Sequence, residues 1–369
     1  MKFTLRPLVF MPQACLIVIA IVLFSTPIRA QLAPKYSNEF LAIGVGARGL
    51  SMANCQVSAV NDVTSGYWNP AGLLRLKAPM QAGLMHSEYF AGIAKYDFAG
   101  FAKRIDSSSV VGVSIIRFGV DDIPNTTELI DAQGNWDYDR ITTFGAADYA
   151  FIFSYARDLG IENLRVGGNA KIVRRKVGDF GGAWGFGLDA GLQYDYKSWN
   201  FAAMVRDVTS TFNAWSFNLS DEVKDVFTTT GNELPDNGLE ITLPKMILGA
   251  ARTFSFSEKF TLLAELDMDW TFDGKRNVLI KSNPLSIDPH LGIELGFKNM
   301  IFLRSGIGNM QYVTDFVGKK TLNIQPNFGV GVRIKSITVD YAFTDIGDAS
   351  VALYSNIFSL KFDLNKKPD

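Results

Sequence analysis

The residues of this chain best suited to chemistry are its two histidines, His86 and His290. His290 and Glu294 lie four residues apart, so on a strand, where successive side chains alternate, they share one face. A histidine can activate a serine nucleophile, but no serine here stands in the glycine-flanked turn that such a nucleophile requires. We therefore expect these polar residues on one sheet face, with no catalytic residue and no enzymatic activity.

A ladder of carboxylates, Glu265, Asp267 and Asp269, forms a second polar face. Basic residues of matching parity on other segments are Lys171, Arg175, Arg304 and Arg333. Two interpretations are open: a charged lining that selects what enters a lumen, or mutual neutralisation between a wall and the segment it encloses. We favour neutralisation, because both signs occur in similar number. No cluster has the usual spacing of metal ligands, so we expect neither a metal nor a cofactor.

Gly44, Gly46 and Gly49 match the glycine fingerprint of dinucleotide-binding sites. That fingerprint holds a pyrophosphate only at the start of a helix within a strand–helix–strand unit. No such alternation follows here, so we interpret the glycines as backbone that packs closely against a neighbour.

The first thirty residues have the pattern of an export signal. Lys2 and Arg6 precede an apolar run at 16–24, and Ala30 is a small residue suited to cleavage. The run is shorter than the roughly 20 residues that a spanning helix needs. We therefore predict a signal peptide at 1–30, Sec-type export and cleavage near Ala30.

The charge and cysteine content of the chain that remains after cleavage near Ala30 exclude some classes of function. It removes Lys2, Arg6 and Arg29 from the 36 basic residues, which leaves 33 against 37 acidic residues and a net charge of −4. This balance excludes a nucleic-acid partner. Cys55 becomes the single cysteine, so a disulfide-stapled secreted scaffold is excluded as well.

From Met80 onward the sequence predicts about 14 strands, each close to the length of a tilted membrane strand. Apolar and polar side chains alternate within them. One expected strand has Leu262, Leu266 and Trp270 on one face and the carboxylate ladder on the other. Aromatic residues gather near the ends of the apolar faces, as in the interfacial girdles of membrane barrels.

The connections between the expected strands alternate in length. Long ones follow the third, seventh, ninth, eleventh and thirteenth strands, at 119–146, 209–242, 272–287, 309–320 and 345–352. Short turns follow the even strands, and the first and fifth connections, near Ala91-Gly92 and at 178–182, are short exceptions among the odd strands. Long outer loops and short periplasmic turns are typical of an up-and-down bacterial barrel, whereas a soluble sandwich has no reason to alternate in this way.

These patterns predict an all-β fold: a closed antiparallel transmembrane β-barrel of about 14 strands, in contact with outer-membrane lipid. The sheet must close because hydrocarbon does not tolerate unpaired backbone groups. A ring of that size is too wide for its own side chains to fill. We therefore divide the chain into the signal peptide, a plug at 31–79 and a barrel at 80–369. The residues expected to face the lumen are Glu265, Asp267, Asp269, His290 and Glu294.

Two of the long connections are candidates for partner binding. Their residues of interest are Asp121, Asp122, Ile123, Pro124, Trp136 and Tyr138 in the first, and Trp215 and Phe217 in the second. Aromatic residues on exposed loops indicate recognition, although loops that fold over the barrel mouth would carry them equally well.

Three motifs follow the expected signal peptide. They are 47–52, which contains Arg48 and Met52, then 57–62, then Tyr67-Trp68-Asn69-Pro70-Ala71-Gly72-Leu73. Together they resemble the N-terminal signature of the PorV/PorQ family of outer-membrane proteins, which are relatives of FadL-type transporters. The segment 120–126 also resembles the first long loop of that family.

The resemblance implies a FadL-like barrel of 14 strands with a plug. The plug residues that it implies are Arg48, Met52, Trp68, Asn69, Pro70, Ala71 and Gly72. It also implies a non-enzymatic role in type IX protein secretion, as an accessory component that binds the secretion translocon or cargo proteins. The alternative is a FadL-like channel that passes hydrophobic small molecules across the outer membrane.

Overall fold

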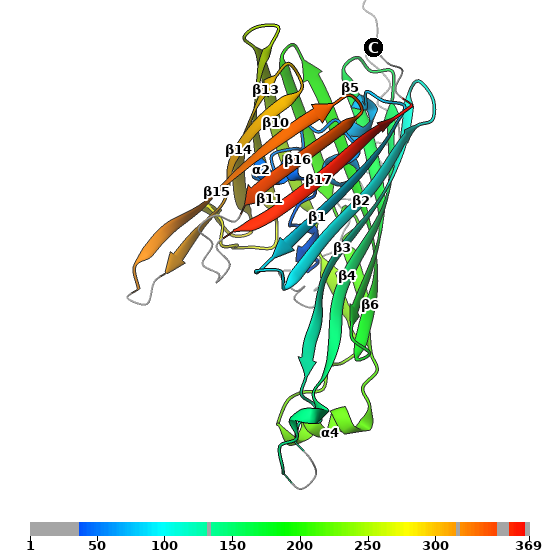
Figure 1. Ribbon diagram of the computed structural model, residues 1–369, viewed down its shortest axis with the longest axis vertical. Helices are drawn as coiled ribbons and strands as arrows, with labels where there is room; N and C mark the ends of the chain where they lie inside the picture. Colours follow the sequence, from blue (N-terminus) through cyan, green and yellow to red (C-terminus); the bar gives the residue numbers. More distant parts are fainter. Residues whose placement is uncertain (1–36, 131–133, 315–317, 345–353, 366–369) are drawn as a thin grey trace, which may run out of the picture. The chain divides into compact units, whose positions relative to one another are not determined.

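The fold is one large antiparallel sheet that encloses residues 37–79 (Figure 1). The computed structural model describes residues 37–130, 134–314, 318–344 and 354–365. The expected signal peptide at 1–30, residues 31–36 of the expected plug and the expected long connection at 345–352 lie outside the described residues.

In the described part of the chain the sheet contains 17 strands, and it closes on itself because β17 pairs with β1. β7 pairs directly with β10 and β11 with β13, so β8, β9 and β12 (Ile280–Lys281) stand outside the ring and 14 strands remain within it. The ring consists of β1 (Met80–Tyr89), β2 (Ala94–Arg104), β3 (Ser109–Asn125), β4 (Thr142–Asp158), β5 (Leu164–Val177), β6 (Gly181–Tyr196), β7 (Trp199–Arg206), β10 (Lys245–Ser255), β11 (Phe260–Thr271), β13 (Ser286–Phe297), β14 (Ile301–Thr314), β15 (Lys320–Ile334), β16 (Ile337–Thr344) and β17 (Ser355–Leu364). The expected closed barrel of about 14 strands is confirmed (Figure 1).

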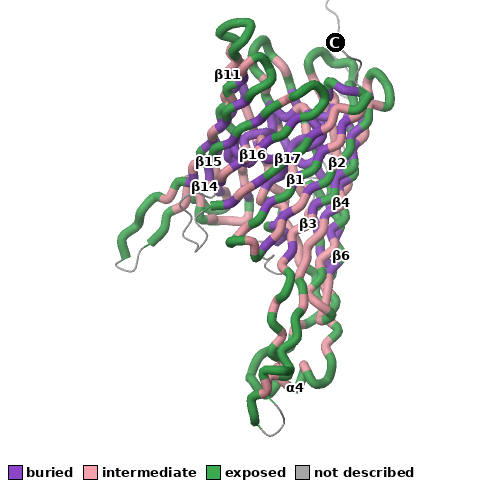
Figure 2. The backbone as a smooth tube through the Cα atoms, viewed as in Figure 1, coloured by how far each residue is buried: buried purple, intermediate pink, exposed green. Residues whose placement is uncertain are grey.

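Side chains on the ring strands alternate between the outside of the barrel and its interior. On β11, Leu266 is 43 % exposed whereas its neighbours Glu265 and Asp267 are each 1 % exposed. An outward row of apolar residues suits contact with lipid, and the polar interior follows from the same two-residue period. Figure 2 shows the result as buried and exposed positions that alternate along the strands of the ring.

The connections differ between the two ends of the barrel. At one end they are short, as at 105–108 between β2 and β3 and at 335–336 between β15 and β16. At the other end β3 is joined to β4 by 126–141, and β7 reaches β10 through 207–244. We call these the short-turn end and the long-loop end. In bacterial barrels they face the periplasm and the outside, respectively.

The connection 207–244 is more ordered than the loop expected there. It forms β8 (Thr211–Phe217), α4 (Asp221–Thr229) and β9 (Leu239–Thr242). Pairing between β6 and β7 begins only at Ala190, so the outer part of β6 has an open edge that β8 completes. Trp215 and Phe217, expected on a loop, therefore lie on a strand. In Figures 1 and 2 the region around α4 projects from the ring and is mostly exposed.

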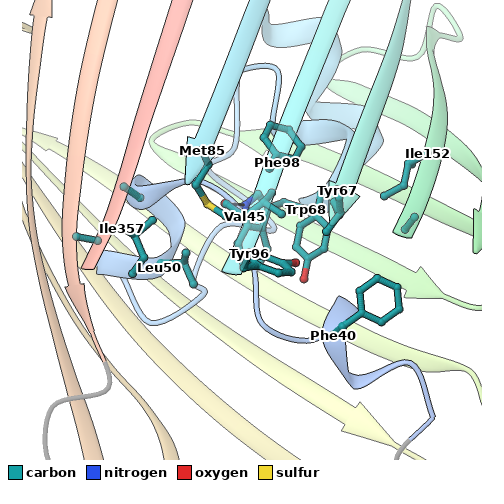
Figure 3. Close-up of a cluster of buried hydrophobic side chains, with 14 of the residues drawn as sticks. Phe40, Val45, Leu50, Tyr67, Trp68, Met85, Tyr96, Phe98, Ile152 and Ile357 are labelled. Carbon is teal, nitrogen blue, oxygen red and sulfur yellow. Dashed lines mark hydrogen bonds between the residues drawn. The ribbon is translucent and has the colours of Figure 1, made fainter. Parts of the chain in front are cut away.

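Residues 37–79, which we call the N-terminal segment, form no strand and lie inside the ring. Their helices are η1 (Glu39–Leu41), α2 (Ala47–Ser51), α3 (Ser65–Trp68) and η2 (Pro70–Arg75). Leu50 and Trp68 of the segment share an apolar cluster with Met85, Tyr96 and Phe98 of the wall (Figure 3). Within the described ranges, no helix combines the length and apolar character that crossing a bilayer requires.

Glycines let backbones approach one another where the segment meets the wall. A Cβ at Gly306 of β14 would lie 2.2 Å from the carbonyl carbon of Met52, which is fully buried there. Within the segment itself, a Cβ at Gly72 would lie 2.7 Å from the carbonyl oxygen of Val60. Neither position has room for a side chain, so both contacts depend on glycine.

We expect Gly306→Ala to loosen the N-terminal segment while the ring stays intact. The added methyl must displace backbone, and overpacking of this kind costs about 1–3 kcal/mol. Amide hydrogen exchange of residues 37–79 in detergent should therefore accelerate by roughly 5- to 150-fold. Gly168→Ala is the matched control, because its Cβ would meet only the Asp189 carbonyl oxygen, at 3.4 Å. Equal exchange in the two variants would contradict the close contact.

Candidate functional site

The N-terminal segment folds around a motif whose aromatic side chains bind its own backbone. Trp68 donates its indole N–H to the carbonyl oxygen of Val45 at 2.9 Å, and Tyr67 donates its hydroxyl to that of Leu41 at 2.6 Å. The two rings meet edge to face with centroids 4.8 Å apart. The guanidinium of Arg206 on β7 lies 4.3 Å from the Tyr67 ring centroid. These contacts hold the path of the chain between 41 and 68.

Asn69 and Pro70 begin helix η2 and attach it to the wall. The Asn69 side chain accepts a hydrogen bond from the Ala71 N–H at 3.2 Å. It also donates to the carbonyl oxygens of Val57, at 3.1 Å, and of Leu192 on β6, at 3.0 Å. Pro70 stands at the first helical position, where its missing N–H leaves no donor unpaired. The expected plug motif thus makes hydrogen bonds both within the N-terminal segment and to the barrel wall.

Two carboxylates of the ladder bind the backbone of the N-terminal segment. Asp267 accepts the N–H groups of residues 56 and 57 at 2.9 and 3.1 Å. Glu265 accepts those of residues 58 and 59 at 2.7 and 3.1 Å. These hydrogen bonds satisfy four buried N–H groups outside any helix or strand. These two residues therefore bind the segment through its backbone amides, and within the described residues neither has the cationic partner that the neutralisation interpretation expects.

Six charged residues form a chain of ion pairs between the N-terminal segment and the wall. The pairs are Arg48–Glu294 at 2.8 Å, Glu294–Arg304 at 2.6 Å, Arg304–Asp340 at 2.7 Å, Asp340–Lys361 at 3.2 Å and Lys361–Asp62 at 2.8 Å. The most exposed of these side chains is only 12 % exposed. We call this set the ion-pair chain. Three positive charges offset three negative ones, so the buried set is neutral.

Asp62 ends the ion-pair chain as an ionised carboxylate. Burial alone raises its pKa, but Lys361 and Arg48 lower that pKa well below its ordinary range. Thr64 adds two hydrogen bonds to one carboxylate oxygen, from its N–H at 2.9 Å and from its hydroxyl at 2.5 Å. The charge on Asp62 is therefore retained throughout the neutral pH range.

A cavity of about 710 Å³ lies between the N-terminal segment and the long-loop end. We call it the outer cavity. Its apolar lining includes Phe40, Ile43 and Leu50 of the segment and Phe90 and Phe118 of the barrel. These residues stand opposite polar groups of β10 to β17, so the cavity has one apolar and one polar wall.

The polar wall of the outer cavity centres on His290. Its Nε2 atom lies 3.8 Å from a carboxylate oxygen of Asp269 and 3.7 Å from one of Asp288. Neither ring nitrogen has a hydrogen-bond partner in the part of the chain that the structure describes. Asp269 is also paired with Lys245. The third member of the ladder thus serves this cavity instead of the backbone of the segment.

A second cavity, of about 540 Å³, lies on the other side of the N-terminal segment. It reaches the short-turn end, because Asn299 and Lys335 of two turns line it. We call it the inner cavity. Arg48, Asp62 and Glu294 of the ion-pair chain line it as well. The segment therefore separates two cavities that differ in charge.

The titratable residues singled out in the sequence lie in separate places. His290 lines the outer cavity, whereas Glu294, four residues along the same strand, lines the inner cavity. The His86 side chain is 52 % exposed on the outer face of β1, with Nδ1 at 2.7 Å from Asp97. The two histidines therefore do not share a site. No group of three His, Cys, Asp or Glu side chains within the described ranges is placed to hold a metal ion.

The residues expected to bind partners lie at the long-loop end, in three settings. Asp121, Asp122, Ile123 and Pro124 belong to the outer part of β3, where the pairing with β4 shifts register. Trp136 and Tyr138 are 64 % and 66 % exposed, with ring centroids 6.4 Å apart. Trp215 is instead held within the β8–β9 ribbon, since its indole N–H donates to Glu240 of β9 at 2.7 Å, and the guanidinium of Arg175 on β5 lies 5.0 Å from its ring centroid. Trp136 and Tyr138 thus form the exposed aromatic pair.

Several residues that build the site were not identified from the sequence. Phe40, Phe118 and Asp288 line the outer cavity, and Asp340 and Lys361 complete the ion-pair chain. A signal for the last two was present: each is a charge at a buried, inward position of a strand whose outward positions are mostly apolar. The sequence carries no such signal for Phe40, Phe118 and Asp288. These residues line the outer cavity only because of where the N-terminal segment ends along the barrel.

Arg304→Gln should destabilise the barrel strongly. It removes the cation between Glu294 and Asp340, and breaking a buried ion pair costs about 3–5 kcal/mol. The measurement is the free energy of unfolding in urea from phospholipid vesicles. Lys95→Gln is the control, because its pair with Asp121 is about half exposed and such pairs contribute about 0–1 kcal/mol. An Arg304→Gln effect no larger than that of the control would contradict this role.

Comparison with known proteins identifies the fold. No protein-family model and no curated protein sequence matches this chain. The toluene transporter TodX of Pseudomonas putida aligns with a TM-score of 0.55 and 13 % identity, over 87 % of this chain and 98 % of TodX.

Two further solved structures are similar to the same extent. The CymD monoaromatic hydrocarbon channel gives a TM-score of 0.53 and 13 % identity, over 88 % of this chain and 98 % of CymD. The toluene transporter TbuX of Ralstonia pickettii gives 0.50 and 12 %, over 87 % and 98 %. The chain thus has the FadL-like fold, a closed barrel of 14 strands with an N-terminal non-strand region, which is consistent with the bacterial outer membrane.

Proposed function

We propose that the protein is an outer-membrane channel that admits hydrophobic small molecules. The observation that carries this proposal is the outer cavity, with its volume of about 710 Å³ at the long-loop end and its apolar wall. Ligand pockets typically have volumes of about 300–1,000 Å³ and mostly apolar linings. The similar structures are a toluene transporter and a monoaromatic hydrocarbon channel by description, and their likeness supports the same class of ligand here.

The energetics of the outer cavity suit brief occupancy. A small aromatic molecule that buries about 200 Å² of apolar surface gains about 5 kcal/mol. Association itself costs at least about 4 kcal/mol in translational and rotational freedom. The difference between these two free energies is small, so the ligand binds weakly. A channel needs weak binding because the ligand must also leave. Phe90 stands at the entrance, in the turn between β1 and β2, and is 49 % exposed.

Phe90→Asp should reduce entry into the outer cavity. The change places a charge where the apolar ligand must pass, and aspartate tolerates the positive φ of 53° at this position. We expect the initial uptake of labelled toluene by cells that produce the protein to fall roughly threefold or more. Phe256→Asp is the matched control, because Phe256 is 68 % exposed in a turn at the short-turn end.

Two outcomes of the uptake experiment would contradict these statements. If cells with the native protein take up toluene no faster than cells without it, toluene is not a ligand and the channel proposal loses its support. If Phe90→Asp and Phe256→Asp behave alike, the entrance does not lie at Phe90.

A second candidate function is partner binding in type IX protein secretion. It is supported by the exposed Trp136 and Tyr138, because aromatic residues dominate the energy of protein interfaces, and by the resemblance of the N-terminal motifs to the PorV/PorQ family. In this case the loop 126–141 would bind the secretion translocon or a cargo protein, and the N-terminal segment would keep the lumen closed.

The double variant Trp136→Ala with Tyr138→Ala tests the second candidate. Loss of two interface aromatics costs about 2 kcal/mol or more each, so the fraction of type IX cargo attached to the cell surface should fall at least several-fold. Surface proteolysis of whole cells measures that fraction. Tyr196→Ala, at the short-turn end and 50 % exposed, is the control. Normal surface attachment in a gene-deletion strain without a paralogue would exclude the function.

A further inference from the structure

The inner cavity has an excess of positive charge that the proposed channel does not use. Three basic residues that line it, Lys77, Arg333 and Lys335, form no ion pair with the described residues. The single acidic lining residue outside the ion-pair chain is Asp363, which accepts a hydrogen bond from Gln81 at 2.6 Å. Three positive charges against one negative charge leave an excess of +2.

The remaining basic residues of the inner cavity do not remove this excess. Arg48, Arg304 and Lys361 are neutralised within the ion-pair chain. Arg75 lies 3.8 Å from Asp195, but Arg165 shares that carboxylate. The cavity thus combines a concave shape with unmatched positive charge, and low-dielectric walls concentrate the potential of such a cleft.

Arg333 differs from an ordinary solvated side chain at a barrel rim. Lys77 and Lys335 lie in exposed connections, where any barrel can carry lysines. Arg333 is an inward residue of β15, and its guanidinium lies 5.5 Å from the Phe302 ring centroid. Its Nε donates to the Thr338 hydroxyl at 3.2 Å, and within the described ranges its two terminal nitrogens donate no hydrogen bond to another residue. The fork is therefore oriented and available.

We propose that the inner cavity binds an anionic group, a carboxylate or a phosphate, on a molecule that enters from the short-turn end. Arg333 would hold that group through its two terminal nitrogens, because the planar fork matches both anions in a bidentate geometry. Lys77 and Lys335 add charge at the entrance. The volume of about 540 Å³ accommodates a small molecule or a lipid headgroup.

The outer cavity does not share this chemistry. Lys245 there is paired with Asp269, and Arg276 is paired with Asp273 and Glu39. Among the described residues, His290 is the basic partner of Asp288. An anion would therefore meet unmatched positive charge only after reaching the side of the N-terminal segment that faces the short turns. The anion site is independent of the channel function, because it requires neither the apolar wall nor passage through the lumen.

Calorimetric titration of the purified full chain in a non-ionic detergent tests this site. Pyrophosphate is the phosphate probe and citrate is the carboxylate probe, each at low ionic strength and again at 0.5 M salt. We expect saturable binding that weakens with salt. Arg333→Gln should raise the Kd about tenfold or more, because it removes a charged bidentate donor, and Arg333→Lys should give an intermediate value.

Lys259→Gln is the control variant. It removes the same charge from the short-turn end but lies in the β10–β11 turn, outside the lining of the inner cavity. Its Kd should equal that of the native protein. The double variant Lys77→Gln with Lys335→Gln lies in connections of the chain, so it keeps the test valid if Arg333→Gln does not fold, and it too should weaken binding several-fold.

The results separate a site from general charge attraction. Absence of binding by both probes to the native protein overturns the proposal, and so does equal weakening by Lys259→Gln and by the cavity variants. A repeat in phosphatidylcholine nanodiscs, with and without phosphatidylglycerol, identifies the source of the anion. If phosphatidylglycerol blocks pyrophosphate, a lipid headgroup occupies the site, and if it does not, the ligand is a soluble anion.

Discussion

Backbone hydrogen bonding in a medium without water is the constraint on which this structure depends. Every N–H and C=O of a membrane strand must be paired within the sheet, and β17 meets β1 for that reason. A ring of 14 strands is too wide for its own side chains to fill, so the N-terminal segment occupies it. The same constraint then applies to the segment. Four of its N–H groups outside helices find their acceptors in Glu265 and Asp267 of the wall.

The N-terminal segment and the barrel wall are complementary in shape and in charge. Gly306 leaves room for the backbone at Met52, and the ion-pair chain connects Arg48 and Asp62 to four wall strands. Buried ion pairs add little net stability, since desolvation offsets their attraction. Their effect here is geometric: each charge requires its partner in place, so the segment has one position in which all six are paired.

The sequence predicted features that follow from the alternation of side chains along a strand. It did not predict features that follow from how far each strand extends. Alternation and loop rhythm were sufficient for the number of strands. The β8–β9 ribbon was not predicted, and its residues were expected to form a loop. The ribbon forms because β6 extends beyond β7 and leaves an edge with which β8 pairs. His290 and Glu294 were rightly placed on one face, yet the segment between them assigns them to different cavities. Glu265 and Asp267 accept hydrogen bonds from backbone N–H groups of the N-terminal segment. The sequence could not predict this, because it shows which side chains are charged but not which backbone groups lie near them.

A hydrophobic ligand in the outer cavity cannot displace the whole N-terminal segment. Each of its bonds to a charged group is worth about 1.5–3 kcal/mol, and there are several, whereas a drug-sized ligand supplies about 0.3 kcal/mol per atom. Residues 37–39 have fewer such bonds: Ser37 and Asn38 share hydrogen bonds with Thr242 and Asn213, and the half-exposed Glu39 is paired with Arg276. Ligand binding would therefore reshape the outer cavity at 37–39 and leave residues 45–62 in place.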